Sequence, residues 1–106
     1  MTIKELAERL GGELAVDSGA DKELSAFYAG DFLSNVMAKA PASGAWFTVM
    51  NNVNVAGVAV LADVAVIVIC EGVKPHLSLE AKAEEQGLCI ICTELPVFEA
   101  CVRAGK

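Results

Sequence analysis

Aromatic residues and histidine are scarce in this chain, which limits the kinds of site it can build. Aromatic residues make up 6% of the 106 residues, and His76 is the only histidine. A single histidine excludes two-histidine metal sites, and no Ser, Cys or Asp stands at a spacing from His76 that would indicate a catalytic triad. Because His76 follows Pro75 at the start of a charged segment, we expect it to be a solvent-exposed residue rather than a general base.

Positive charge and long apolar runs are also missing. Eight lysines and arginines stand singly against fourteen acidic residues, giving a net charge of −6, so we expect no binding to nucleic acid or to an anionic membrane. The longest apolar run, Val53–Cys70, is interrupted by Asn54 and Asp63, which argues against a membrane span. Charged residues within Met1–Gly12 argue against a signal peptide. A cytoplasmic location is expected.

Cofactor and metal motifs are absent as well. The sequence has neither a Gly-x-x-x-x-Gly-Lys-Ser/Thr phosphate loop nor a Gly-x-Gly-x-x-Gly fingerprint. Cys89 and Cys92 have Cys-x-x-Cys spacing, but on a strand residues three apart point to opposite faces. We therefore expect these thiols, with Cys70 and Cys101, to be reduced and buried, and we expect no cofactor and no metal.

Four short apolar runs are the main positive feature, and each ends at a polar or glycine-bearing turn. Hydrophobic residues reach 55%, with an excess of alanine and valine that suits tight packing of helices on a sheet. This rhythm predicts a single α/β domain over residues 1–106, with a mainly parallel sheet of four or five strands and helices on both faces. The runs are Leu24–Ala29, Ala45–Met50, Val64–Cys70 and Leu88–Cys92.

Helices are predicted between and around these strands from caps, stops and apolar spacing. We expect Glu13–Val16 to form a hairpin with Leu24–Ala29 at the sheet edge. The predicted helices run from Thr2 to Leu10, Phe32 to Ala40, Val53 to Ala62, Pro75 to Gln86 and Pro96 to Arg103. The buried stripe expected in the second comprises Phe32, Leu33, Val36 and Met37, and the last is expected to present Val97, Phe98 and Cys101 to the sheet.

Small polar residues follow the strands, where α/β domains usually hold ligands. Asp31 is well placed as the N-cap of the helix after Gly30; the free amides there could also approach an anion or a partner backbone, although the aspartate would repel phosphate. The asparagines after Met50 could read a polar ligand or only form a turn. The candidate ligand-binding residues are Asp31, Ser34, Asn52, Asn54, Glu71 and Thr93.

Several segments together resemble the DRTGG domain and, more distantly, the amino-terminal domain of HPr kinase/phosphorylase. The similarity spans about Gly11 to Phe98. The name-giving Asp-Arg-Thr-Gly-Gly string is absent, and Asn52 stands where many stand-alone members have a histidine. The resemblance is carried by Gly30-Asp31-Phe-Leu-Ser34-Asn-Val-Met37, Trp46-Phe-Thr48-Val49, Asn54-Val55, Ala59, Val64–Gly72, Pro75, Lys82-Ala83 and Thr93.

This resemblance implies a non-catalytic regulatory or dimer-forming module. Such domains occur alone in anaerobic bacteria, or attached to CBS-pair pyrophosphatases and phosphotransacetylases that perform the chemistry. We therefore expect a homodimer that senses a small polar ligand or docks a partner protein. Two alternatives stay open: an enzyme or phosphoacceptor using Asp31 or a cysteine, for which no activating base is visible, and a purely structural dimer module.

Overall fold

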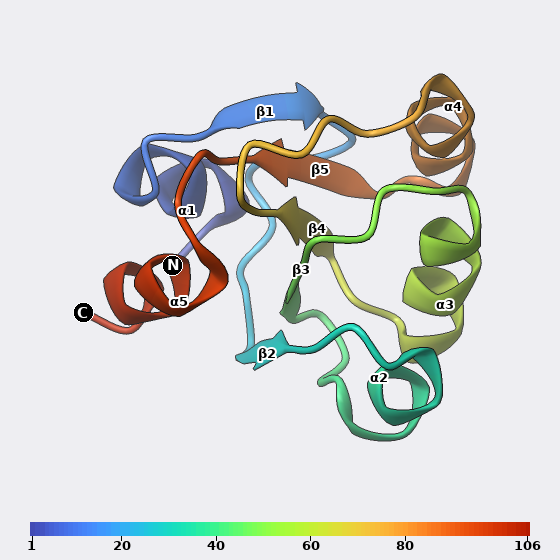
Figure 1. The fold of residues 1–106 in the computed structure, drawn as a ribbon, viewed down its shortest axis with the longest axis horizontal. Helices are drawn as coiled ribbons and strands as arrows, with labels where there is room; N and C mark the ends of the chain where they lie inside the picture. Colours follow the sequence, from blue (N-terminus) through green and yellow to red (C-terminus); the bar gives the residue numbers. More distant parts are fainter.

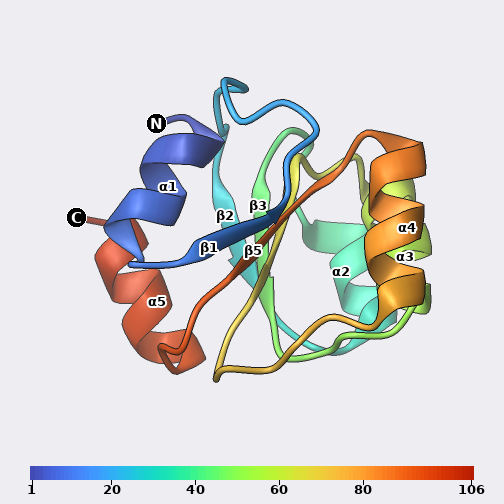
Figure 2. The same ribbon diagram turned by 90° about the horizontal axis from the view of Figure 1, so that it is seen from above.

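A computed structural model describes the whole chain, residues 1–106, and confirms the expected α/β architecture. One five-stranded sheet lies between two layers of helices, with α1 and α5 on one face and α2, α3 and α4 on the other (Figures 1 and 2). The elements are α1 (Ile3–Arg9), β1 (Glu13–Val16), β2 (Phe27–Ala29), α2 (Leu33–Lys39), β3 (Ala45–Thr48), α3 (Asn54–Ala62), β4 (Val66–Ile69), α4 (Leu77–Gln86), β5 (Cys89–Cys92) and α5 (Val97–Ala104).

The order of the strands explains the two layers. The order is β1-β5-β4-β3-β2, in which β2 to β5 are mutually parallel and β1 is antiparallel to β5. From β2 to β5 each crossover moves the chain one strand in the same direction. Right-handed crossovers of this kind place α2, α3 and α4 on one face. The opposite face is covered by α1 and α5, which lie outside this series.

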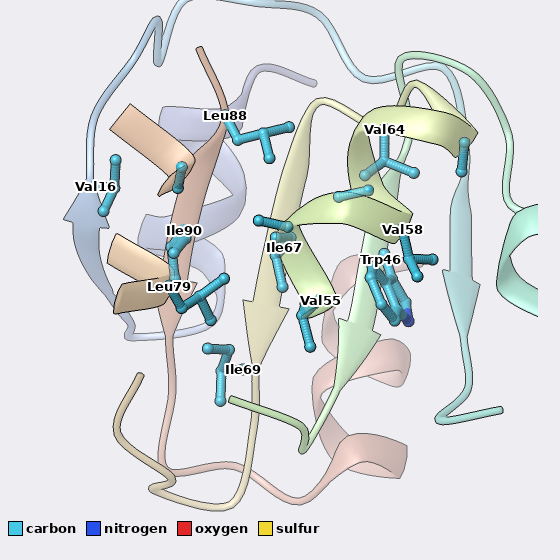
Figure 3. Packing of buried hydrophobic residues seen from close by; sticks show 14 of the residues in the cluster. Val16, Trp46, Val55, Val58, Val64, Ile67, Ile69, Leu79, Leu88 and Ile90 are labelled. Atoms are coloured by element: carbon cyan, nitrogen blue, oxygen red, sulfur yellow. The ribbon is translucent and has the colours of Figure 1, made fainter. Parts of the chain in front are cut away.

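Side chains of the parallel strands alternate between two hydrophobic cores. Trp46, Ile67 and Ile90 point towards α2, α3 and α4 (Figure 3), whereas Phe47 and Val68 belong to the core beneath α1 and α5. All residues of β3 and β4 are buried. Strands covered on both faces need apolar side chains on both, which is why these runs do not alternate with polar residues.

Local chemistry sets the helix ends that the sequence predicts. The Thr2 side chain accepts a hydrogen bond from the Glu5 backbone N–H at 3.2 Å, and the Glu5 carboxylate accepts one from the Thr2 N–H at 2.8 Å. This capping box satisfies two amides at the start of α1 and lowers the pKa of Glu5. At its other end, α4 stops at Gly87, whose φ of 73° is readily adopted by glycine.

The predicted hairpin is wrong. Glu13–Val16 pairs antiparallel with β5, whereas only residues 27–29 of the predicted second strand form β2, which pairs with β3 at the far edge. Neighbours in sequence often pair in a sheet. Here β1 instead covers the outer edge of β5, whose Ile90 and Ile91 are fully buried.

Two predicted helix stripes also need correction. In α2 only Val36 is buried, and Phe32 and Met37 are exposed, because this seven-residue helix lies at the margin of the sheet. In α5 Val97 and Cys101 pack partly buried against the core, as expected, beside the buried Ala100 and Ala104, but Phe98 is exposed to solvent. The buried face of α5 is therefore centred on its alanines, which places Phe98 on the outer side of the helix.

No helix in this fold has both the length and the apolar character needed to cross a membrane.

Candidate functional site

The loops after β4 and β5 leave the sheet in opposite directions. The carboxyl ends of β2 to β5 lie along one edge of the sheet, because these strands are parallel. After β4 the chain continues to α4 on one face, and after β5 it continues to α5 on the other (Figure 2). Such a divergence between neighbouring parallel strands opens a crevice, and open α/β sheets commonly bind ligands there.

A cavity of about 280 Å³ lies at this divergence and is named here the carboxyl-edge cavity. Three separate segments form its walls. The start of β1 contributes Gly11 and Glu13, the loop after β4 contributes Gly72 and Lys74, and the end of β5 contributes Cys92. Small-molecule sites usually begin near 300 Å³, so the carboxyl-edge cavity has room for a ligand of about amino-acid size.

A second cavity, of about 290 Å³, opens at the opposite edge of the sheet. Its lining includes Asp63 and Gly87, the residues that end α3 and α4. Helix C-termini present carbonyl groups, and this edge holds no divergence of loops after parallel strands. The carboxyl-edge cavity is therefore the candidate functional site.

A tight turn forms one wall of the carboxyl-edge cavity. Glu71 and Gly72 both have positive φ, 64° and 72°, and the Val73 N–H donates a hydrogen bond to the Cys70 carbonyl at 3.2 Å. Two successive residues with positive φ between such partners are typical of a type I′ turn. Glycine adopts this conformation at little cost, whereas Glu71 adopts it only because the surroundings hold it.

The loop after β5 holds this turn in place. The Glu71 N–H donates to the Leu95 carbonyl at 2.9 Å, and the Gly72 N–H donates to the Thr93 carbonyl at 3.0 Å. A Cβ atom on Gly72 would lie 2.9 Å from a carboxylate oxygen of Glu94. The wall is therefore preorganised, and the positive φ of Gly72 favours glycine at this point, since the exposed Glu94 side chain can move aside.

Negative charge exceeds positive charge around the carboxyl-edge cavity. Its lining contains the carboxylates of Glu13, Glu80 and Glu94 and the ammonium group of Lys74. Burial raises the pKa of the Cys92 thiol, and the nearby charges of Glu13 and Glu80 raise it further. Cys92 is therefore a neutral thiol at pH 7, poorly suited to act as a nucleophile.

Asp31 links the ends of β2 and β3 and does not cap α2, contrary to the sequence prediction. One oxygen of its carboxylate accepts hydrogen bonds from the Thr48 hydroxyl at 2.5 Å and from the Val49 N–H at 3.1 Å. The N-cap of α2 is Phe32, which makes no side-chain cap. The Asp31 carboxylate bonds to Thr48 because Thr48 is fully buried and its hydroxyl needs a hydrogen-bond acceptor.

The asparagines at positions 51, 52 and 54 form a turn and a hydrogen-bonded link between two loops. The Asn52 side chain accepts a hydrogen bond from the Asn54 N–H at 3.0 Å, which shapes the entry to α3. The Asn51 side-chain amide donates a hydrogen bond to the Lys74 carbonyl at 2.7 Å, and the Asn51 backbone carbonyl accepts one from the His76 N–H at 3.0 Å. The exit of β3 is thus fastened to the loop that lines the cavity. His76 is exposed, as expected.

The other candidate residues are spread along the same edge. Thr93 is buried, donates to the Leu10 carbonyl at 3.1 Å and accepts from the Leu95 N–H at 3.2 Å. Ser34 lies in the first turn of α2 and is exposed. None of the six candidates lines the carboxyl-edge cavity, although Glu71 precedes Gly72 in its wall. Ligand binding by these six residues stays a prediction.

Several residues of the carboxyl-edge cavity were missed in the sequence. Lys74 and Glu94 follow the strands that were recognised, but they were not linked to a site. Glu13 could not be included, because its strand was assigned to the wrong edge. The sequence signal that could have located the cavity is topological. If α5 covers the face of the sheet opposite α4, the loops after β4 and β5 must diverge.

The cysteines are free, as expected, and their burial is uneven. Cys70 and Cys89 are buried, whereas Cys92 and Cys101 are partly buried. Cys89 packs into the core beneath α1 and α5, and Cys92 packs on the opposite side. The two thiols of the Cys-x-x-Cys sequence therefore diverge, and no group of three or more metal-ligating side chains occurs in the structure.

Comparisons with known proteins identify the fold. No protein family profile and no curated protein sequence matches the chain. Among solved structures it is similar to the CBS and DRTGG domains of the regulatory region of Clostridium perfringens pyrophosphatase, complexed with the activator diadenosine tetraphosphate. The TM-score is 0.81 at 9% identity, and the similarity covers 97% of this chain but 45% of that chain. The resemblance to the DRTGG domain is thereby confirmed for the fold.

Proposed function

We propose that this domain is a non-catalytic regulatory module that binds a small polar ligand in the carboxyl-edge cavity and acts as a homodimer. The observation that carries this proposal is the position of the cavity, at the divergence of the loops after β4 and β5. The similarity in fold to a regulatory region that binds an activator supports a regulatory role. The chain spans less than half of that structure. Because the domain itself is proposed to be non-catalytic, the proposal includes docking to a partner protein.

The size and charge of the cavity narrow the class of ligand. A volume of about 280 Å³ is too small for a dinucleotide. Three carboxylates against one ammonium disfavour a polyanion and favour a ligand that carries positive charge. Lys74 can pair with a carboxylate of the same ligand. A cationic or zwitterionic metabolite of amino-acid size therefore fits better than diadenosine tetraphosphate.

The six residues predicted from the sequence have different parts in this proposal. Glu71 lies nearest the cavity, and its side chain makes no hydrogen bond within the chain. Ser34 and Asn54 also have free side chains, at the starts of α2 and α3. We propose that these three extend the site along the edge. Asp31, Asn52 and Thr93 position the backbone around it.

A titration followed by amide NMR tests the proposal. The probes are L-arginine, L-lysine and putrescine, each at millimolar concentration, with diadenosine tetraphosphate as the polyanionic comparison. We expect at least one cationic probe to shift the amide signals of Gly72, Val73 and Lys74, and we expect no such shift with diadenosine tetraphosphate. If no cationic probe shifts these signals, the proposed ligand class is wrong.

Two variants and a matched control sharpen this titration. Glu80→Gln and Glu94→Gln each remove one carboxylate from the cavity while keeping its shape, so both weaken binding of the cationic probe. Glu84→Gln is the control, because Glu84 is exposed on α4 and does not line the cavity. Equal affinities for all three variants would place the probe elsewhere.

The two alternative functions predict different results. A phosphoacceptor using Asp31 or a cysteine would gain a stable adduct on incubation with acetyl phosphate, visible as an increase in intact mass. We expect none, because Asp31 is already bonded to Thr48 and Val49 and burial raises the pKa of all four thiols. A purely structural dimer module would dimerise and give no amide shifts with any probe.

A further inference from the structure

The outer face of α5 carries apolar side chains that nothing in the chain covers. Phe98 is 78% exposed and Val102 is 41% exposed. These residues are four apart, so they lie on the same side of the helix, opposite Ala100 and Ala104, which are buried. A large aromatic ring left in water next to a second apolar side chain is typical of an interaction surface.

A row of opposite charges runs beside these apolar residues. Glu99 and Arg103 are also four residues apart and are both exposed. Neither forms an ion pair within the chain, whose ion pairs are Met1–Glu23 and Lys82–Glu85. The α5 face therefore presents an unpaired carboxylate near its start and an unpaired guanidinium group near its end.

We infer that this face binds a second copy of the same chain, with the two α5 helices packed antiparallel about a two-fold axis on the outer face, midway between Glu99 and Arg103. In that arrangement Glu99 of one copy lies opposite Arg103 of the other, and the contact occurs twice. Phe98 and Val102 fill the seam between the helices. The inference rests on the proposed homodimer and specifies its surface.

The charge distribution of the whole chain supports a second copy as the partner. With a net charge of −6, two copies repel each other over most of their surfaces. The end of α5 is different, because Arg103 and Lys106 lie there together with Arg9, which donates a hydrogen bond to the Lys106 carbonyl at 2.9 Å. This basic corner lets one copy approach the Glu99 carboxylate of the other.

The contact is small, which sets the expected strength of the dimer. An eight-residue helix is about 12 Å long, and stable interfaces bury roughly 1,200 Å² or more. On this face of the sheet α5 also contacts β2. There Phe27 is 40% exposed, with its ring centroid 6.0 Å from that of Phe47. We therefore expect a dimer that dissociates on dilution.

Charge reversal measured by sedimentation equilibrium of the full chain tests this surface. Glu99→Lys and Arg103→Glu each place like charges opposite one another at both ends of the contact. We expect each to raise the dimer dissociation constant about tenfold or more, equivalent to about 1.4 kcal/mol. The double variant Glu99→Lys/Arg103→Glu restores the pairing with its signs exchanged, so its dissociation constant returns close to that of the unaltered chain.

Two further variants complete the experiment. Phe98→Ser removes the apolar anchor and weakens the dimer, whereas the matched control Leu77→Ser leaves it unchanged, because Leu77 is 83% exposed on α4, on the other face of the sheet. Circular dichroism verifies that each variant folds.

A dimer that none of the α5 variants weakens would overturn the proposed surface but not the homodimer. A chain that stays monomeric at every concentration would overturn both. Either result is independent of the ligand titration, which reports on the carboxyl-edge cavity.

Discussion

At the residue scale, Asp31 is the side chain whose role differs most from its sequence prediction. Its carboxylate accepts hydrogen bonds from the Thr48 hydroxyl and the Val49 N–H. Asp31→Ala leaves the buried hydroxyl without that acceptor. We expect the free energy of unfolding to fall by about 1–3 kcal/mol, as measured by urea denaturation.

Asn54→Ala is the matched control for Asp31→Ala. Asn54 also lies near the start of a helix on the carboxyl edge, but its side chain makes no hydrogen bond and is exposed. Its removal changes stability by no more than about 0.5 kcal/mol. Similar losses in both variants would contradict the assigned role of Asp31.

The Cys70 thiol gives a prediction about pH. Burial raises its pKa from an ordinary 9.0 to about 12. The folded chain therefore keeps a proton that the unfolded chain loses, so this contribution to stability is complete below pH 9 and declines as the pH rises towards 12. The stability difference between the unaltered chain and Cys70→Ala should shrink between pH 8 and pH 11, as measured by urea denaturation. A constant difference would contradict the raised pKa.

At the scale of elements, the turn after β4 depends on Gly72. Gly72→Ala places a side chain in a backbone conformation with φ of 72° and brings its Cβ to 2.9 Å from Glu94. We expect a loss of about 1–2 kcal/mol in the free energy of unfolding, together with altered amide signals around the carboxyl-edge cavity.

Gly57→Ala is the natural comparison for Gly72→Ala. Gly57 lies within α3, and a Cβ there would meet no atom within 4 Å. Alanine is the better helix former, so this substitution should raise stability by about 0.5–1 kcal/mol. Opposite signs for the two glycines are the expected result, and a loss in both would contradict the open space at Gly57.

Most elements were predictable because their signals are local. The capping box at Thr2, the stop at Gly87 and the unbroken apolar run of β4 depend on nearby residues. The pairing of β1 was not predictable, because it depends on the distant edge of β5. The rotation of α5 was missed for a related reason: alanines decide its buried face, and Phe98 is the more conspicuous side chain.

At the scale of the whole molecule, the edge that holds the candidate site was predictable but its residues were not. Parallel strands place Asp31, Asn52 and Thr93 on one edge, as expected. Their hydrogen bonds within the chain could not be foreseen from sequence, since the partners lie up to 83 residues away. The carboxyl-edge cavity also needs β1, whose position was assigned wrongly.

Native mass spectrometry of the freshly purified chain tests the central proposal most directly, because it reports bound molecules and assembly together. We expect a dimer that carries an additional small-molecule mass, and we expect that mass to be lost from Glu80→Gln and Glu94→Gln but retained by Glu84→Gln. A chain that shows only bare protein masses, as monomer or as dimer, would contradict the proposal.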